Sequence, residues 1–253
     1  MYDPPGYLWA ITIAGVIAIL ATTAVVLYGG TARAGLSRRR AALLTGGAAV
    51  VLGGWFAASA VVAGHGGYHT QPGRQVPWLP VAVIGFLGAL LALSRIPVVA
   101  RVLAAPDMPR RLLLPHSFRV TGVVFLIVMA LGHLPALFAL PAGLGDIAVG
   151  ISAPLVARGL ARGTGRRAAL WFNVFGLTDL AVALTLGTLI GYRLVSVGPS
   201  TAPLGELPIA LIPTVAVPLL LALHIGSLAG LAAAPRTAAS RPASTRRPVS
   251  SAG

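Results

Sequence analysis

The sequence predicts an all-α membrane protein: a transmembrane bundle of seven helices, with the N-terminus outside and the C-terminus in the cytoplasm. Of its 253 residues, 57% are hydrophobic and 9% are charged, whereas soluble proteins carry about 25% charged residues. The mean hydropathy is +0.88. Apolar runs approach the ~20 residues that a helix needs to cross the hydrocarbon core. These observations place the chain among the multi-pass helical proteins.

Seven apolar segments follow one another along the chain. The first comes after "MYDPPGY", which has no basic residue, so it is expected to be an uncleaved anchor rather than a secretory signal. The second carries four glycines that favour close helix contacts (Gly46, Gly47, Gly53 and Gly54). The third and fifth segments are the shortest. The predicted helices lie near 8–28, 41–64, 78–94, 118–138, 144–161, 168–191 and 207–231.

The later segments carry the features that break the helical pattern. A short turn, "PALFALPAGLG", is expected to join the fourth and fifth helices, because it is rich in Pro and Gly. Pro213 and Pro218 should kink the seventh helix. Residues 1–233 are thus expected to form one seven-helix transmembrane domain. Residues 234–253 are rich in Pro, Ser, Ala and Arg and are expected to form a disordered, basic cytoplasmic tail.

The arginines determine the predicted orientation. Seventeen of them lie in the tail and in the connections between the first and second, third and fourth, and fifth and sixth predicted helices. The other two, Arg74 and Arg193, lie in the alternate connections. Positive residues accumulate on the cytoplasmic side of membrane proteins. We therefore expect a multi-pass protein of the bacterial cytoplasmic (inner) membrane whose basic face rests on anionic lipid. The net charge of +14 is explained by this face, and nucleic acid is not an expected partner.

The composition excludes several kinds of chemistry. The chain has no cysteine, which excludes disulfides and Cys-ligated metal centres, and no lysine, which excludes a Schiff base to retinal or pyridoxal phosphate. His65 and His69 have a spacing that suits a metal on a helix, but the glycines between them indicate a loop. A haem with two histidine ligands is disfavoured because the intramembrane histidines lie at different expected heights. We predict no cofactor, no metal and no catalytic residues, with an enzyme activity left open.

Polar side chains inside the predicted spans are the candidate functional residues, because each ionisable group at bilayer depth costs ~2.5–3.5 kcal/mol on insertion. At 1.5 Å per residue, His224 is expected ~10 Å and Asp179 ~16 Å above the cytoplasmic edge. His133 and Asp146 are both expected at ~24 Å or slightly higher. Such a series crosses the bilayer as a proton or cation path would. The candidates for a substrate or ion path are His133, Asp146, Asn173, Asp179, Glu206 and His224.

Asp146 allows three interpretations. It follows Gly143 and Gly145 at the expected start of the fifth helix, where a carboxylate caps free N–H groups. It is also expected near His133 on the neighbouring helix, close enough to pair. Finally, "GLGD" has the GxGD pattern of intramembrane aspartyl proteases such as presenilins and prepilin peptidases, whose chemistry needs a second carboxylate, here Asp179. The protease is the remote alternative.

Three stretches, "FALPAGLGDIAVGISAPLVA", "WFNVFGLTDLAVALTLG" and "IPTVAVPLLLALHIGSL", resemble a family of uncharacterised bacterial polytopic integral membrane proteins. The resemblance covers roughly residues 118–231 and implies no activity, cofactor or site residue.

Two functions remain after these exclusions. The first is binding or translocation of a small solute or a proton through the bundle of the fourth to seventh helices. The second is a non-catalytic membrane scaffold or partner subunit, in which the polar groups only hydrogen-bond between helices and the chain assembles with a copy of itself or with another membrane protein.

Overall fold

A computed structural model describes residues 3–69 and 77–239 of the chain, and within these ranges it is built from helices without a strand. The elements in chain order are α1 (Gly6–Arg33), α2 (Arg38–Gly64), α3 (Trp78–Ser94), α4 (Pro97–Leu103), α5 (Met108–Arg111), the 3₁₀ helix η1 (Leu114–Gly122), α6 (Val123–Ala130), α7 (Ala136–Ala161), α8 (Arg166–Gly191), the 3₁₀ helix η2 (Ala202–Gly205), the π-helix η3 (Ile212–Ala216) and α9 (Val217–Ala239).

Six helical stretches of the described chain are long and apolar enough to cross a membrane: α1, α2, Met108–Ala130 (α5 to α6), α7, α8 and Ile212–Ala233 (η3 and α9). The chain is therefore an all-helical, multi-pass membrane protein. The third predicted segment corresponds to α3, which has 17 residues and is bent by 88° against α4.

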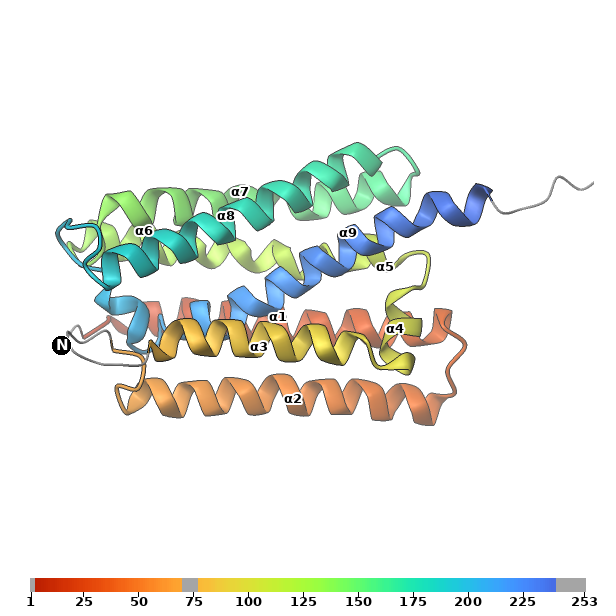
Figure 1. The fold of residues 1–253 in the computed structure, drawn as a ribbon, viewed down its shortest axis with the longest axis horizontal. Coiled ribbons are helices and arrows are strands. Elements are labelled where there is room, and N and C mark those ends of the chain that lie inside the picture. Colours follow the sequence, from red (N-terminus) through yellow and green to blue (C-terminus); the bar gives the residue numbers. More distant parts are fainter. Residues whose placement is uncertain (1–2, 70–76, 240–253) are drawn as a thin grey trace, which may run out of the picture.

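Helix α9 runs obliquely between two groups of helices (Figure 1). Helices α1, α2 and α3 lie on one side of it, and α6, α7 and α8 lie on the other. Helix α9 packs on both α3 and α8, while α7 packs on η1 and α8. The connections α1–α2 and α7–α8, together with α4 and α5, lie at one end of the bundle, which we call the arginine-rich end. The start of α1 marks the opposite end, called the N-terminal end.

The turn between the predicted fourth and fifth helices is in a different place from the one expected. It lies at residues 131–135, where Gly132 has a φ of +80° and Pro135 precedes the first residue of α7. The fourth helical stretch thus starts at Met108 instead of residue 118, and α7 starts at Ala136 instead of residue 144. Pro141 lies inside α7. Pro and Gly break helices in soluble proteins, which is why the sequence predicts a turn here, but neighbouring helices permit prolines inside membrane helices.

The 3₁₀ helix η1 determines which residues of the fourth stretch face the interior. Such a helix has three residues per turn, so residues three apart lie on one face, and runs of more than three or four residues are uncommon. In η1, which is 9 residues long, His116, Arg119 and Gly122 have this spacing, and all three are buried. An arginine that the sequence assigns to a cytoplasmic connection is thereby carried into the bundle.

The predicted tail overlaps the described chain only at its beginning. Helix α9 continues to Ala239, so the first six residues of the segment 234–253 are helical. Residues 240–253 lie outside the described ranges.

Candidate functional site

A single buried guanidinium binds two carboxylates at the centre of the molecule. Arg119 of η1 is 2% exposed. Its Nε donates to Asp146 Oδ1 of α7 at 2.6 Å, and its Nη2 donates to Asp179 Oδ2 of α8. Three elements that are distant in sequence are joined by these two bonds. Charge-assisted hydrogen bonds of this kind are about twice as strong as neutral ones.

The third arm of the guanidinium starts a chain of hydrogen bonds toward the arginine-rich end. Arg119 Nη1 lies 3.3 Å from His224 Nε2, and His224 Nδ1 lies 2.9 Å from Asn173 Oδ1. Asn173 Nδ2 donates to Ser227 Oγ at 3.1 Å, and Ser227 Oγ donates to the carbonyl of Pro109 at 3.0 Å. Because the amide oxygen of Asn173 accepts, His224 carries its proton on Nδ1 and offers the Nε2 lone pair to Arg119. Each group in this chain thus donates to the next one in the direction from Arg119 to the Pro109 carbonyl.

His116 stacks on His224 beside the guanidinium. Their ring centroids are 3.9 Å apart, and Phe172 meets the His116 ring edge-on at 5.7 Å. His116 is fully buried, and neither of its ring nitrogens has a hydrogen-bond partner among the described residues. The His116 ring therefore helps to hold the His224 ring in position by packing against it.

Glycines on the facing helices make room for these side chains. A Cβ at Gly145 would overlap the carboxylate of Asp179, and a Cβ at Gly176 would overlap the His224 ring. The second glycine of "GLGD" is therefore explained by close approach of α7 and α8. Gly143 and Gly145 both lie inside α7, so they do not form part of the turn expected in "PALFALPAGLG".

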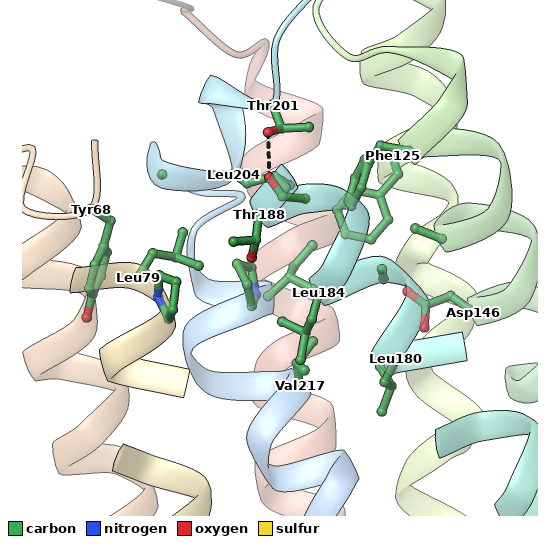
Figure 2. Close-up of a pocket in the computed structure, with 18 of the residues that line it drawn as sticks. Tyr68, Leu79, Phe125, Asp146, Leu180, Leu184, Thr188, Thr201, Leu204 and Val217 are labelled. Atoms are coloured by element: carbon green, nitrogen blue, oxygen red, sulfur yellow. Dashed lines mark hydrogen bonds between the residues drawn. The ribbon is translucent and has the colours of Figure 1, made fainter. Parts of the chain in front are cut away.

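A cavity of about 60 Å³ extends from the carboxylates toward the N-terminal end of the bundle. Figure 2 shows Asp146 among apolar side chains that include Phe125 and Leu184, with Thr201 and Leu204 farther along the cavity. Asp179 also lines it. Thr201 is held by a hydrogen bond to the Gly187 carbonyl, drawn as a dashed line in Figure 2. The cavity is thus an apolar chamber with charged groups at one end.

The structure brings four of the six candidate residues together: Asp146, Asn173, Asp179 and His224. Their expected separation in height is wrong, since three of them contact one guanidinium. His133 lies in the turn 131–135 and is exposed, and Glu206 lies at the end of η2, 3.9 Å from His69 Nε2. These two candidates lie outside the site.

The interpretation of Asp146 as a helix cap paired with His133 is also wrong. Asp146 lies inside α7, ten residues after Ala136, a rise of ~15 Å from the start of the helix. The partner of its carboxylate is Arg119. The error has one cause: the sequence predicts the turn in "PALFALPAGLG", whereas the structure has it in "LGHLP".

Sequence reasoning missed Arg119, Ser227 and His116. An apolar run follows Arg119 directly, so this residue resembles the other arginines of a connection. The signal that could have identified it is the spacing His116, Arg119, Gly122, which aligns the three residues on a 3₁₀ helix but not on an α-helix. Ser227 follows His224 by three residues and so lies on the same face of α9.

A second charged cluster lies at the arginine-rich end. Asp107 Oδ2 accepts from Arg111 Nε and lies 3.0 Å from Arg33 Nη1 and 3.8 Å from Arg110 Nη2. Burial acts to raise the pKa of Asp107, but the hydrogen bond from Arg111 and the charges of Arg111 and Arg33 outweigh it, so the pKa is lowered. This cluster ties the end of α1 to α5 and lies apart from the central site.

The fold and the central site define a class: multi-pass helical membrane proteins with a charged cluster inside the bundle. Within it, the chain belongs to the family described as "Domain of unknown function (DUF8737)", which matches residues 76–232, more than half of the chain. No curated protein and no solved structure matches the chain. The matched region contains η1, α7, α8 and α9 as far as residue 232, and hence every residue of the central site.

Proposed function

We propose that the chain crosses the bacterial cytoplasmic membrane seven times, N-terminus outside, and binds and moves protons through the bundle of α6 to α9. Helix α3 is the additional span in this proposal. With Arg119 inside the bundle, the sequence still assigns sixteen arginines to the cytoplasmic connections and tail and two to the alternate connections, so the positive-inside argument is retained. Asp146 and Asp179 are the proton-binding groups.

The charge balance of the site carries the proposal. Arg119 is always protonated and supplies one positive charge, whereas the two carboxylates that it binds supply two negative charges when ionised. One uncompensated charge inside a protein costs several kcal/mol. One proton removes this charge, so the site has a built-in place for a proton.

The size of the cavity favours a proton over a larger solute. A volume of about 60 Å³ holds a few water molecules, since each needs ~10–15 Å³ by this measure. An engineered cavity that accepts benzene is larger, ~150 Å³. Water in the cavity would connect Asp146 and Asp179 to the N-terminal end.

The other side of the site is closed by hydrogen bonds. The chain of bonds from His224 to Pro109 passes through the amide of Asn173, and an amide does not exchange protons readily at neutral pH. In this conformation the acid pair is therefore connected toward the outside only. Release to the cytoplasm requires His224 and Arg119 to separate, and the π-helical start of the last span, η3, is the element that we expect to move.

The test uses purified protein in liposomes that contain a pH-sensitive dye. We expect a proton flux under an imposed pH gradient, and we expect Asp179→Asn to lose most of it. Asp3→Asn, which removes an exposed carboxylate outside the helices, is the matched control and should conduct like the wild type. Equal fluxes for the wild type and Asp179→Asn would contradict the proposal, as would the absence of flux in the wild type.

The alternative function, a membrane scaffold or partner subunit, is supported by one observation. A Cβ at Gly46, Gly47, Gly53 or Gly54 would have no atom of the described residues within 4 Å beyond the adjacent residues and backbone of its own helix, so these glycines of α2 face open space. A helix of another molecule can approach them closely, as small residues allow in membranes. In this function Gly47→Ile should shift a dimer to a monomer in detergent, whereas Gly88→Ile on α3, which also faces open space, is the control. An unchanged oligomeric state in Gly47→Ile would contradict an interface at α2.

The protease hypothesis gains no support from the site. Aspartyl proteases hold an activated water between two carboxylates, whereas the two carboxylates here are bound to one guanidinium. Asp146 and Asp179 are thus used as an anionic binding pair.

A further inference from the structure

A second cavity, between α1 and α9, is also lined by Asp146. Its volume is about 20 Å³, enough for one water-sized particle. Thr12 of α1 lines it, together with Arg119, Thr121 and Gly122 of η1 and with Asp146. The remaining lining side chains are apolar. The cavity thus brings oxygen atoms of α1, η1 and α7 around one small space.

Thr12 is the unusual residue of this cavity. It is 2% exposed, and within residues 3–69 and 77–239 its Oγ1 has no hydrogen-bond partner. Thr23 on the same helix donates to the carbonyl of Ile19, the common arrangement for a buried threonine. Buried polar atoms without a partner are rare, and a bound water or ion is a common explanation. The Thr12 hydroxyl is therefore available to bind a small particle in the cavity.

Asp146 supplies a negative oxygen to the same space. Its Oδ1 accepts from Arg119, and its Oδ2 lies beside Gly122, 2.6 Å from where a Cβ of that residue would be. Gly122 lines the second cavity. The three nitrogens of the Arg119 guanidinium are directed at Asp146, Asp179 and His224. A particle in the cavity therefore meets the hydroxyl and carboxylate oxygens beside the Arg119 guanidinium and a wall of apolar side chains.

We propose that the second cavity binds a single dehydrated monovalent cation of the size of Na⁺, with Thr12 and Asp146 as ligands. The inference rests on the proposed role of Asp146 as a charged binding group, but not on proton movement. The cluster of Arg119 with two ionised carboxylates has one surplus negative charge, which selects a cation over a neutral water. A divalent ion would reverse the charge instead of neutralising it. Oxygen ligands suit hard cations.

Sodium then competes with the proton for the same charge. When the acid pair takes up a proton, the surplus charge is gone and the cation loses its main attraction. When Na⁺ is bound, a proton on the pair is no longer needed. Binding of the two ions is therefore linked, and each should weaken the other by the same factor.

The experiment measures the thermal unfolding temperature of the full chain in detergent, in NaCl or in choline chloride at equal ionic strength. We expect the unfolding temperature to rise saturably with Na⁺, as for any ligand of the folded state, and to stay flat in choline. Thr12→Val should increase the half-saturating Na⁺ concentration by at least the ~10-fold that loss of a supporting partner costs a metal site. Thr23→Val is the matched control and should respond to Na⁺ like the wild type.

The outcomes separate a cation site from a buried water and from the proposed function. The same unfolding temperature in Na⁺ and choline would overturn the cation site, as would an unchanged Na⁺ response in Thr12→Val. Because valine has the shape of threonine, Thr12→Val should fold, and its stability in choline checks this directly. A Na⁺ response without proton flux in liposomes would contradict proton movement but not the cation site. Proton flux without a Na⁺ response would contradict the cation site but not proton movement.

Discussion

Removing the guanidinium at the centre of the bundle should destabilise the protein strongly. In Arg119→Met, Asp146 and Asp179 lose their common partner while remaining inside the bundle. Deleting one partner of a buried ion pair typically costs ~3–5 kcal/mol, because a charge is left without compensation. The charge is doubled here, so we expect the free energy of unfolding to fall by at least about 3 kcal/mol at neutral pH.

The assay is reversible unfolding in mixed micelles, with Arg162→Met as the control. Arg162 is exposed, and a substitution there should stay within about 0.5 kcal/mol of the wild type. Replacing both aspartates by asparagine in the Arg119→Met background should recover most of the loss, because the uncompensated charges are then absent. A loss below about 1 kcal/mol in Arg119→Met, the size of an ordinary hydrogen bond, would refute the reasoning.

Three further predictions follow from other parts of the structure. Gly176→Ala should destabilise by about 1–3 kcal/mol in the same unfolding assay, because its Cβ overlaps the His224 ring; Gly88→Ala, which has open space, should be neutral or slightly stabilising. The lowered pKa of Asp107 means that its contribution to stability is present above pH 3.8, its value in the unfolded chain, and is lost as the pH falls through the folded value. The unfolding temperatures of the wild type and Asp107→Asn should therefore converge once the pH is below the folded pKa of Asp107. A reporter fused to the C-terminus should be active in the cytoplasm, and activity in the periplasm would overturn the proposed orientation.

The sequence was sufficient for the class of fold and for four residues of the site. Hydrophobic runs of membrane-crossing length depend on local composition alone, so the helices can be placed without knowledge of their packing. Asp146, Asn173, Asp179 and His224 stand out for the same reason: a polar group in an apolar run is visible in one dimension and costly enough to need a partner.

The identity of the partner was decided by the tertiary structure. The sequence pairs Asp146 with His133 because the two are expected at similar height on neighbouring helices. The structure instead pairs Asp146 with Arg119, which is 27 residues away, and links Arg119 to Asp179 and His224, 60 and 105 residues away. Two local geometries made this possible. A turn at 131–135 placed Asp146 inside α7, and the 3₁₀ helix η1 turned Arg119 inward.

Sequence alone thus determined that this protein lies in a membrane and that buried carboxylates and a histidine must be compensated there. Only the tertiary structure decided that one arginine contacts both carboxylates and the histidine. The physical reason is that the cost of burying a charge is a property of the residue and its local surroundings, whereas its compensation depends on distances between helices, which are set by the glycines that let α7, α8 and α9 approach.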